Sequence, residues 1–311
     1  MLLPEASSIA PRIDALFWSM TLLCAAVAVA VFVALIVYAV RYRRGSNADR
    51  RGRLNQDLAV ELTWILVPFA LFVAAFIWSL TIFTFAHTPP ADARTVYVIA
   101  RQWMWKVEHP EGQREINTLH VPLGMPVRLA MTSQDVIHSF YVPAFRLKQD
   151  VLPGRYTQLW FVPTRLGSFP LLCAQYCGLD HASMGGEIIV MPPAGFARWL
   201  AGHAGAGSLA ARGAQLFRSH GCSGCHDPKS AIHAPDLTGL YGTTVHLADG
   251  RTVVADERYL HDCIVLPAGQ LVAGYPPVMP SFSGQLSEEE LLALIAYIKS
   301  LAAAGPSRGA P

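Results

Sequence analysis

Two long stretches without a charged residue lie near the start of the chain, at residues 15–40 and 62–86. Each exceeds the roughly 20 apolar residues that a helix needs to cross a bilayer. Arginines gather between the two stretches, from Arg41 to Arg53, whereas Arg12 is the only basic residue before the first. Because short basic loops stay in the cytoplasm, we expect a hairpin of two membrane-spanning helices with both chain ends on the outer face.

A cleaved secretory signal is the alternative interpretation of the first apolar stretch. Such signals carry basic residues before a shorter apolar core, of about 7–15 residues. Here the basic residues follow the stretch, which favours a retained membrane span.

The pattern changes to short alternating segments between residues 91 and 193, for example at 95–100 and 156–162. Several short strands separated by proline and glycine predict a β-sandwich or barrel. The small residues of 194–206 predict a linker. A capped amphipathic helix is expected at the end of 207–302.

These patterns divide the chain into five parts, of which the last is expected to be a disordered tail. The parts are 1–90, with the two spans, 91–193, 194–206, 207–302 and 303–311.

Composition supports a membrane protein, because 52% of the residues are hydrophobic, 15% are charged and the mean hydropathy is +0.33. The net charge of +2 is too small to indicate a nucleic-acid partner. Six cysteines are too few for a disulfide scaffold, and four of them form two close pairs, a spacing typical of metal or cofactor ligands.

The first pair lies in a loop that also holds an imidazole and a thioether. The four side chains are Cys173, Cys177, His181 and Met184. Thiolate and thioether ligands together favour copper, and two thiolates that bridge two coppers would use both cysteines. Each copper would then need an imidazole, and His138 is best placed to supply the second. A structural zinc site formed by the cysteines and histidines is the alternative, but it would leave Met184 without a role.

The second pair belongs to Cys222-Ser-Gly-Cys225-His226, the attachment signature of c-type haem. A redox disulfide or half of a zinc site could use the two cysteines, but neither needs the adjacent histidine. Met279 is the only methionine between residues 203 and 301 and is the candidate sixth iron ligand. A Met/His pair leaves no open position on the iron, which suits electron transfer.

Four histidines are rival sixth ligands, although a lone histidine is more often a surface or hydrogen-bonded residue. They are His220, His233, His246 and His261. Cys24 and Cys263 have no evident partner, and we expect both to be inert apolar residues.

The segments 138–143, 147–155 and 173–184 closely resemble cytochrome c oxidase subunit II, and the match covers roughly residues 10–195. The resemblance implies a two-helix hairpin and a cupredoxin domain that carries the binuclear copper centre CuA. It implies that the cysteines bridge the coppers, that each histidine binds one, that the methionine is a weak axial ligand, and that a backbone carbonyl completes the set. These ligands are His138, Cys173, Gln175 through its carbonyl, Cys177, His181 and Met184.

Gln175 departs from the family, which usually has a glutamate there that helps to bind magnesium at the interface with subunit I. The carbonyl ligand survives this change, and the magnesium site is left open. By the same resemblance, Trp103 matches the tryptophan at which electrons enter, and Glu61 matches a glutamate at the mouth of a proton pathway. The residues alone are equally compatible with Trp103 as part of an aromatic core strand, and with Glu61 as an acidic residue favoured at a helix N-terminus.

Residues 207–302 resemble a class I cytochrome c domain. The whole chain therefore resembles subunit II with a fused cytochrome c, as in bacterial caa3-type oxidases. This implies a multidomain membrane protein with a two-helix transmembrane hairpin, an all-β cupredoxin domain and an all-α cytochrome c domain.

The implied function is electron transfer from a soluble donor such as cytochrome c, through covalent haem c and CuA, to subunit I. Subunit I would reduce O2 to water with proton translocation. Subunit III and the lipid of the bacterial inner membrane are further implied partners.

Two other functions remain open: subunit II of a CuA-type nitric oxide reductase, and a membrane-anchored electron carrier without an enzyme partner. A quinol oxidase subunit is disfavoured, because that branch lacks the copper-binding cysteines. Whether the haem domain rests against the copper domain or swings on its linker is also open.

Overall fold

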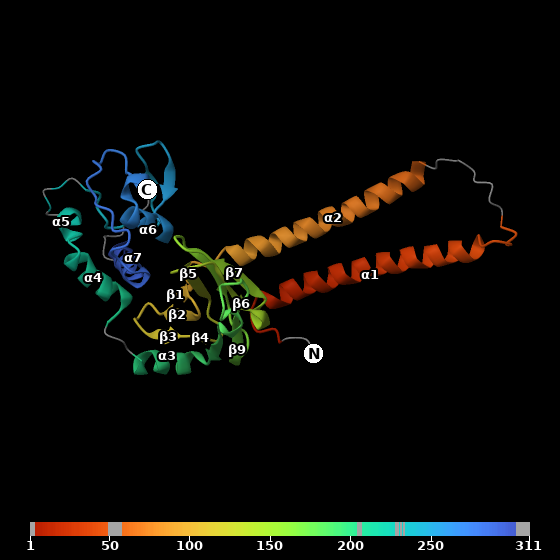
Figure 1. Cartoon of the computed structure of the whole chain (residues 1–311), viewed down its shortest axis with the longest axis horizontal. Coiled ribbons are helices and arrows are strands. Elements are labelled where there is room, and N and C mark those ends of the chain that lie inside the picture. Colours follow the sequence, from red (N-terminus) through yellow and green to blue (C-terminus); the bar gives the residue numbers. More distant parts are fainter. Residues whose placement is uncertain are drawn as a thin grey trace, which may run out of the picture.

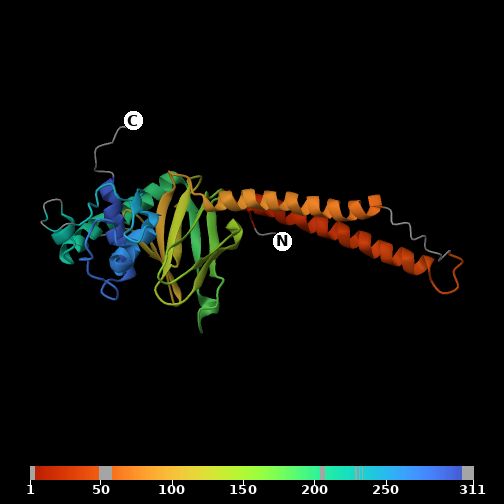
Figure 2. The same ribbon diagram turned by 90° about the horizontal axis from the view of Figure 1, so that it is seen from above.

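The structure is a computed structural model that describes residues 4–48, 58–203, 207–227, 230, 232 and 234–302. A helical hairpin extends from one end of a β-rich module, and a helical module packs on the opposite end (Figures 1 and 2). This arrangement confirms the fold class expected from the sequence.

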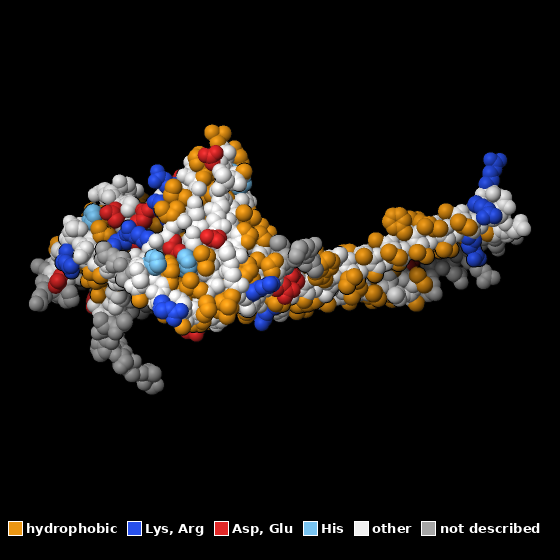
Figure 3. All heavy atoms as spheres, turned by 90° about the horizontal axis from the view of Figure 1, so that it is seen from below, with side chains coloured by type: hydrophobic (Ala, Val, Ile, Leu, Met, Phe, Trp, Pro, Cys, Tyr) orange, Lys and Arg blue, Asp and Glu red, His pale blue; other side chains and the backbone are white. Residues whose placement is uncertain are grey.

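The hairpin consists of α1 (Ala10–Arg41) and α2 (Leu58–His87). Both helices are long and apolar enough to cross a membrane, and their most apolar 18-residue windows have no residue buried inside the structure. Figure 3 shows hydrophobic side chains along the hairpin and basic side chains at its far tip. Arg50, Arg51 and Arg53 lie outside the described residues. So much uncovered apolar surface fits a hairpin surrounded by lipid or by other membrane helices.

Both inner ends of the hairpin are anchored on the β-rich module. Ala6 and Ile9, just before and at the start of α1, are fully buried there. Arg146 pairs with Asp14 at 2.8 Å, and the indole of Trp160 donates a hydrogen bond of 3.0 Å to the carbonyl of Phe85 in α2. These contacts place the module at a set position against the hairpin.

The β module, defined as β1 to β10, is a sandwich of two five-stranded sheets. The first sheet has the order β3-β2-β1-β5-β8 and the second β4-β10-β9-β6-β7. Apolar side chains of both sheets, such as Val98 and Phe140, are fully buried between them. The strands are β1 (Arg94–Arg101), β2 (Met104–Glu108), β3 (Arg114–Ile116), β4 (Thr118–Pro122), β5 (Val127–Ser133), β6 (His138–Val142), β7 (Leu147–Val151), β8 (Thr157–Phe161), β9 (Gly167–Cys173) and β10 (Gly185–Met191), with short helices η1 (Pro143–Phe145) and η2 (His181–Ser183).

The segment predicted as a linker without regular structure is largely helical. Helix α3 (Pro193–Gly202) begins with a proline at its first turn, a position where proline favours a helix. Its Trp199 stacks on His120 of β4, with ring centroids 4.5 Å apart. This aromatic packing explains the helix in a sequence of small residues. Residues 204–206, and the predicted tail at 303–311, lie outside the described residues.

The helical module, defined as α4 to α7, is built on its first and last helices, α4 and α7, which cross each other. A Cβ at Gly213 of α4 would lie 1.9 Å from the carbonyl oxygen of Ala293, so only glycine permits the crossing with α7. The helical module also contains a small hairpin of two strands that was not expected. An Asp249-Gly250 turn, with φ +86° at the glycine, joins the two strands. The elements are α4 (Leu209–Ser219), α5 (Ser223–His226), β11 (Thr244–His246), β12 (Thr252–Val254), α6 (Glu257–Val265), η3 (Pro267–Gln270) and α7 (Glu288–Ala302).

The helical module rests directly on the outer side of the first sheet. A buried apolar cluster joins Tyr97, Ile99 and Ala130 of the sheet to Leu209, Leu292 and Ala293 of α4 and α7.

Ion pairs flank the apolar cluster. Glu257, which is 4% exposed, pairs with Arg128 at 3.1 Å and with Lys299 at 2.7 Å. Lys106 pairs with Glu289 at 2.7 Å. The tertiary structure thus answers a question that the sequence left open, since the two modules are docked.

Glu257 should make this docking dependent on pH. Burial alone would raise the pKa of its carboxyl, but Lys299 and Arg128 lower the pKa to about 2. Because the folded-state pKa lies below the ordinary 4.5, the ion pairs contribute fully above pH 4.5 and are lost as the pH falls toward 2. We expect the difference in unfolding free energy between the wild type and Glu257→Gln to narrow over that range in urea titrations. A difference independent of pH would contradict this assignment.

Candidate copper centre and haem cavity

The last residue of β9 and the loop that joins it to β10, together called the copper loop below, hold five of the six residues predicted as copper ligands. The two strands are antiparallel neighbours, with Leu172 opposite Gly185, so the ends of the loop meet at its base. There the backbone N–H of Cys173 donates a hydrogen bond of 3.2 Å to the carbonyl of Met184. The local sequence therefore needs only this strand pairing to bring its sulfur atoms together.

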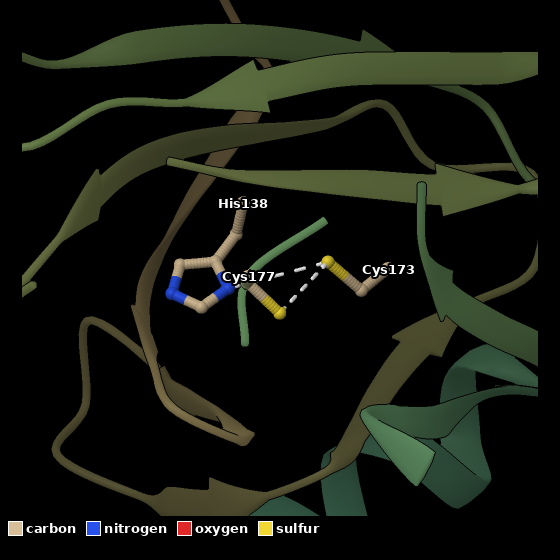
Figure 4. Close-up of side chains that lie close together, drawn as sticks. All are labelled: His138, Cys173 and Cys177. Carbon is tan, nitrogen blue, oxygen red and sulfur yellow. Dashed lines mark hydrogen bonds between the residues drawn. The ribbon is translucent and has the colours of Figure 1, made fainter. Parts of the chain in front are cut away.

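His138 comes from a different part of the chain. It begins β6, which pairs with β9 so that Phe140 lies opposite Cys173. The imidazole is fully buried, and its Nδ1 lies 4.0 Å from Sγ of Cys173. Figure 4 shows this ring and the two cysteine side chains facing one another.

The remaining distances complete a cluster in which the other four predicted ligands lie around the two cysteine sulfur atoms. The Sγ atoms of Cys173 and Cys177 are 3.9 Å apart. Sγ of Cys177 lies 3.5 Å from Nδ1 of His181 and 3.7 Å from Sδ of Met184. Sγ of Cys173 lies 3.3 Å from the carbonyl oxygen of Gln175. Each sulfur thus has its own imidazole.

This distribution of donors fits two metal ions better than one. A single tetrahedral zinc needs four ligand atoms around one point. Among the described residues, the one group whose ligand atoms all lie within 4.8 Å of one another comprises His138, Cys173 and Cys177, and it omits His181. Two sulfurs between two separate imidazoles, with a thioether and a carbonyl beside them, fit a pair of copper ions bridged by thiolates.

The two thiols differ in acidity. Burial opposes ionisation of Cys173, but hydrogen bonds with His138 and with the backbone lower its pKa to about 6. Burial and the neighbouring Cys173 thiolate raise the pKa of Cys177. Two adjacent thiolates therefore require cations between them, which bound metal ions supply.

Trp103 lies beside this loop, between β1 and β2. Its Nε1 donates a hydrogen bond of 3.3 Å to the carbonyl of Cys177, and Nε2 of Gln102 donates one of 2.7 Å to the same oxygen. A Cβ at Gly178 would lie only 2.9 Å from Nε2 of Gln102, so this glycine allows the approach.

The core interpretation of the aromatic stretch fits Trp105, while the part of Trp103 in electron entry stays a prediction. Trp105 is the fully buried core residue, packed against Phe140, whereas Trp103 is half-buried beside the copper loop.

Glu61 lies in the first turn of α2, at the end of the hairpin remote from the β module (Figure 1). An acid is favoured at this place by the helix dipole alone. Its part in a proton pathway therefore stays a prediction.

The predicted haem ligands line one apolar cavity in the helical module. Cys222, Cys225 and His226 lie around α5, and Met279 borders the same cavity. Apolar side chains complete the wall, including Phe217, Leu237, Tyr259, Ile264, Leu294 and Ile298. Nδ1 of His226 donates a hydrogen bond of 3.0 Å to the carbonyl of Pro235, which leaves Nε2 free to bind a metal. An apolar cavity with two thiols, an oriented imidazole and a thioether fits a c-type haem.

The rival histidines separate by position. His220 borders the cavity, while His246 and His261 are not among the residues that line it, and His233 lies outside the described residues. Cys263 also borders the cavity, and burial raises the pKa of its thiol to about 11.

Comparison with known families matches both modules. Residues 112–191 match the model of the cytochrome c oxidase subunit II periplasmic domain, and residues 210–302 match that of cytochrome c. The chain is 30% identical over 300 residues to cytochrome c oxidase subunit 2 of Alkalihalophilus pseudofirmus, covering 89% of this chain and 83% of that protein.

Two further relatives match smaller parts. An alternative cytochrome c oxidase subunit 2 of Bradyrhizobium diazoefficiens is 31% identical, over 56% of this chain and 73% of that protein. The crystal structure of the periplasmic domain of subunit II from Bradyrhizobium japonicum is 30% identical, with a TM-score of 0.36, and covers 37% of this chain and 96% of that one.

Proposed function

Because the chain belongs to the cytochrome c oxidase subunit II family, we propose that it delivers electrons to the catalytic subunit of a caa3-like respiratory oxidase. Family membership makes it a component of an oxidoreductase, anchored in a membrane and carrying its β module on the outer face. The two matched domains imply CuA copper and haem. The observation that carries the proposal is the convergence of both ligand sets on two modules that are docked together.

In the proposed path, electrons pass from a soluble donor such as cytochrome c through one covalent haem c and a binuclear CuA to subunit I, which reduces O2 to water with proton translocation. The chain would sit in a bacterial inner membrane with both termini outside. The uncovered sides of α1 and α2 would pack against subunit I and lipid, with subunit III as a further neighbour.

The cofactors, when bound, supply the sites that accept and release single electrons. The residues of the chain supply position. Cys222 and Cys225 would attach the haem, and His226 and Met279 would hold its iron. The two thiolates would bridge the coppers, with the remaining ligands supplied by His138, Gln175, His181 and Met184.

The docked interface would keep the two centres at a constant separation. Trp103 contacts the copper loop on one side, and on the other side it borders a polar depression closed by Leu286, Ser287 and Glu288 of the helical module. This position favours Trp103 as the residue through which electrons reach the copper loop.

A metal count and a visible to near-infrared spectrum of the purified full-length chain test the proposal. We expect two coppers and one iron per chain, with a near-infrared mixed-valence band that bleaches on reduction. Zinc in place of copper would overturn it. The gas consumed by the copurified complex, O2 or nitric oxide, separates an oxidase from a nitric oxide reductase.

Replacing Met279 by histidine should lower the reduction potential of the haem. A Met/His ligand pair holds the iron at a higher potential than two imidazoles do. Potentiometric titration of the haem absorption measures the change. Met125→His, at an exposed residue of the β module, is the matched control and should leave the potential unchanged. Equal potentials for both variants would exclude Met279 as the ligand.

Replacing Trp103 by alanine should slow the reduction of copper by the haem without loss of either cofactor. Flash reduction of the haem, followed at the near-infrared band, gives the rate. Trp105→Phe serves as the control, because Trp105 is a core residue whose change should reduce stability more than the rate. A Trp103→Ala rate equal to that of the wild type would contradict the assigned path.

A further inference from the structure

The carboxylate of Asp135 joins two parts of the proposed electron path. It lies in the loop between β5 and β6, three residues before His138. Its Oδ1 accepts a hydrogen bond of 2.8 Å from Nε2 of His138 and one of 2.7 Å from the backbone N–H of Val136. Its Oδ2 accepts a hydrogen bond of 2.7 Å from the backbone N–H of Gln102. One side chain therefore contacts both a copper ligand and the turn between β1 and β2 that contains Gln102 and Trp103. This turn with its two strands is called the Trp103 hairpin below.

The first contact determines how His138 presents itself to the metal. A carboxylate only accepts hydrogen bonds, so Nε2 carries the proton and Nδ1 keeps its lone pair toward Cys173. A carboxylate partner also makes an imidazole a stronger donor to a metal. The ring is fully buried, so in the folded chain its Nε2 donates to Asp135 and not to solvent.

The other imidazole of the centre has no such support. His181 is half-buried, and no described protein group accepts a hydrogen bond from its Nε2. The two copper ligands of the same type therefore differ in what orients them. Asp135 therefore orients one of the two imidazoles, and the other has no equivalent partner among the described residues.

The second contact connects His138 to the hairpin of Trp103. The side chains of Gln102 and Trp103 hold the carbonyl of Cys177, while the backbone of Gln102 is held by Asp135. The neighbouring Gln134 donates a hydrogen bond of 2.9 Å to Glu289 of α7. The short loop from Gln134 to His138 thus runs from the helical module to the copper ligand.

We propose that Asp135 is a positioning residue that holds His138 and the Trp103 hairpin in register and lowers the reduction potential of the copper centre. The proposal rests on the proposed copper function. A negative charge hydrogen-bonded to a copper ligand and a more basic imidazole both favour the oxidised centre, and the link to Gln102 keeps the turn between β1 and β2 against the copper loop.

Asp135→Asn in the copper-loaded full-length chain tests this role. Two N–H donors face Oδ1, so the amide oxygen is expected to stay there and the NH2 group to face the N–H of Gln102. This variant keeps the bond to His138, removes the charge and breaks the link to the hairpin. Asp180→Asn is the matched control, because Asp180 precedes the other imidazole ligand but is exposed.

We expect both variants to bind copper. In Asp135→Asn the redox equilibrium of the centre should shift about tenfold toward the reduced form, a rise in potential of about 59 mV for one electron. Copper reduction by the haem should also slow. Asp180→Asn should leave both properties unchanged, and equal behaviour of the two variants would overturn the proposal.

If Asp135→Asn fails to bind copper, a measurement on the wild type tests whether Asp135 holds the proton of His138. Pulsed electron paramagnetic resonance after transfer to D2O reports the exchange of the N–H protons on the two copper-bound rings. The proton of His138, buried against Asp135, should exchange far more slowly than that of His181. Equally fast exchange would overturn the role of Asp135, whereas a wild-type chain without copper would overturn the proposed function itself.

Discussion

Replacing Cys177 by serine is expected to abolish the copper centre and, with it, electron delivery to the catalytic subunit. Cys177 lies within 4 Å of three other predicted ligands, at 3.9 Å from Cys173, 3.5 Å from His181 and 3.7 Å from Met184. A hydroxyl is a hard ligand that does not replace a bridging thiolate on copper. Copper analysis and loss of the near-infrared band measure the effect.

Cys24→Ser is the matched control for this substitution. Cys24 is an exposed residue of α1 and should leave copper content and oxidase turnover unchanged. The haem spectrum should be intact in both variants, because the haem cavity lies in the helical module. An unchanged haem spectrum would show that the loss of copper is local. A Cys177→Ser chain that keeps two coppers and the near-infrared band would refute the bridged centre.

The second large effect is expected from Glu257→Ala, which should release the helical module from the β module. The substitution leaves Arg128 and Lys299 at the interface without their anion, at side-chain exposures of 19% and 21%. Removing one partner of a buried ion pair costs about 3–5 kcal/mol, and because water partly reaches the two cations we expect a loss of about 3 kcal/mol in unfolding free energy. Urea unfolding followed by haem absorption measures it.

Arg258→Ala provides the comparison on the same helix. Arg258 forms an exposed pair with Asp262 at 3.9 Å, of the kind that contributes about 0.5 kcal/mol or less. Glu257→Ala should also slow copper reduction by the haem, because the separation of the centres would no longer be constant. Equal stability of the two variants would show that the ion pairs do not hold the docking.

Local spacing along the chain determined much of what could be predicted. The two membrane spans follow from uncharged stretches whose length alone exceeds a bilayer. Cys173 ends β9, and Cys177, His181 and Met184 follow in the loop to β10, so their proximity needs only the pairing of these two strands. The thiols and the imidazole of 222–226 likewise lie close together because they belong to one short helix and its N-cap residue.

Neighbouring strands and packed modules decided the rest. His138 reaches Cys173, 35 residues away, because β6 pairs with β9 in a particular register. Whether Trp103 is a core residue or lies beside the copper loop depends on the turn between β1 and β2, and its residue type does not indicate which.

The helix at 193–202, the docking of the helical module and the bonds of Asp135 were not predicted. Each depends on contacts between segments far apart in the sequence, such as Trp199 on His120, Glu257 on Arg128, and Asp135 on Gln102. The sequence by itself determined the spans, the two cofactor motifs and the chemistry of their ligands, because these lie within a few residues of one another. Only the tertiary structure decided which distant groups orient those residues and how the two modules dock, because burial and pairing across the fold set those contacts.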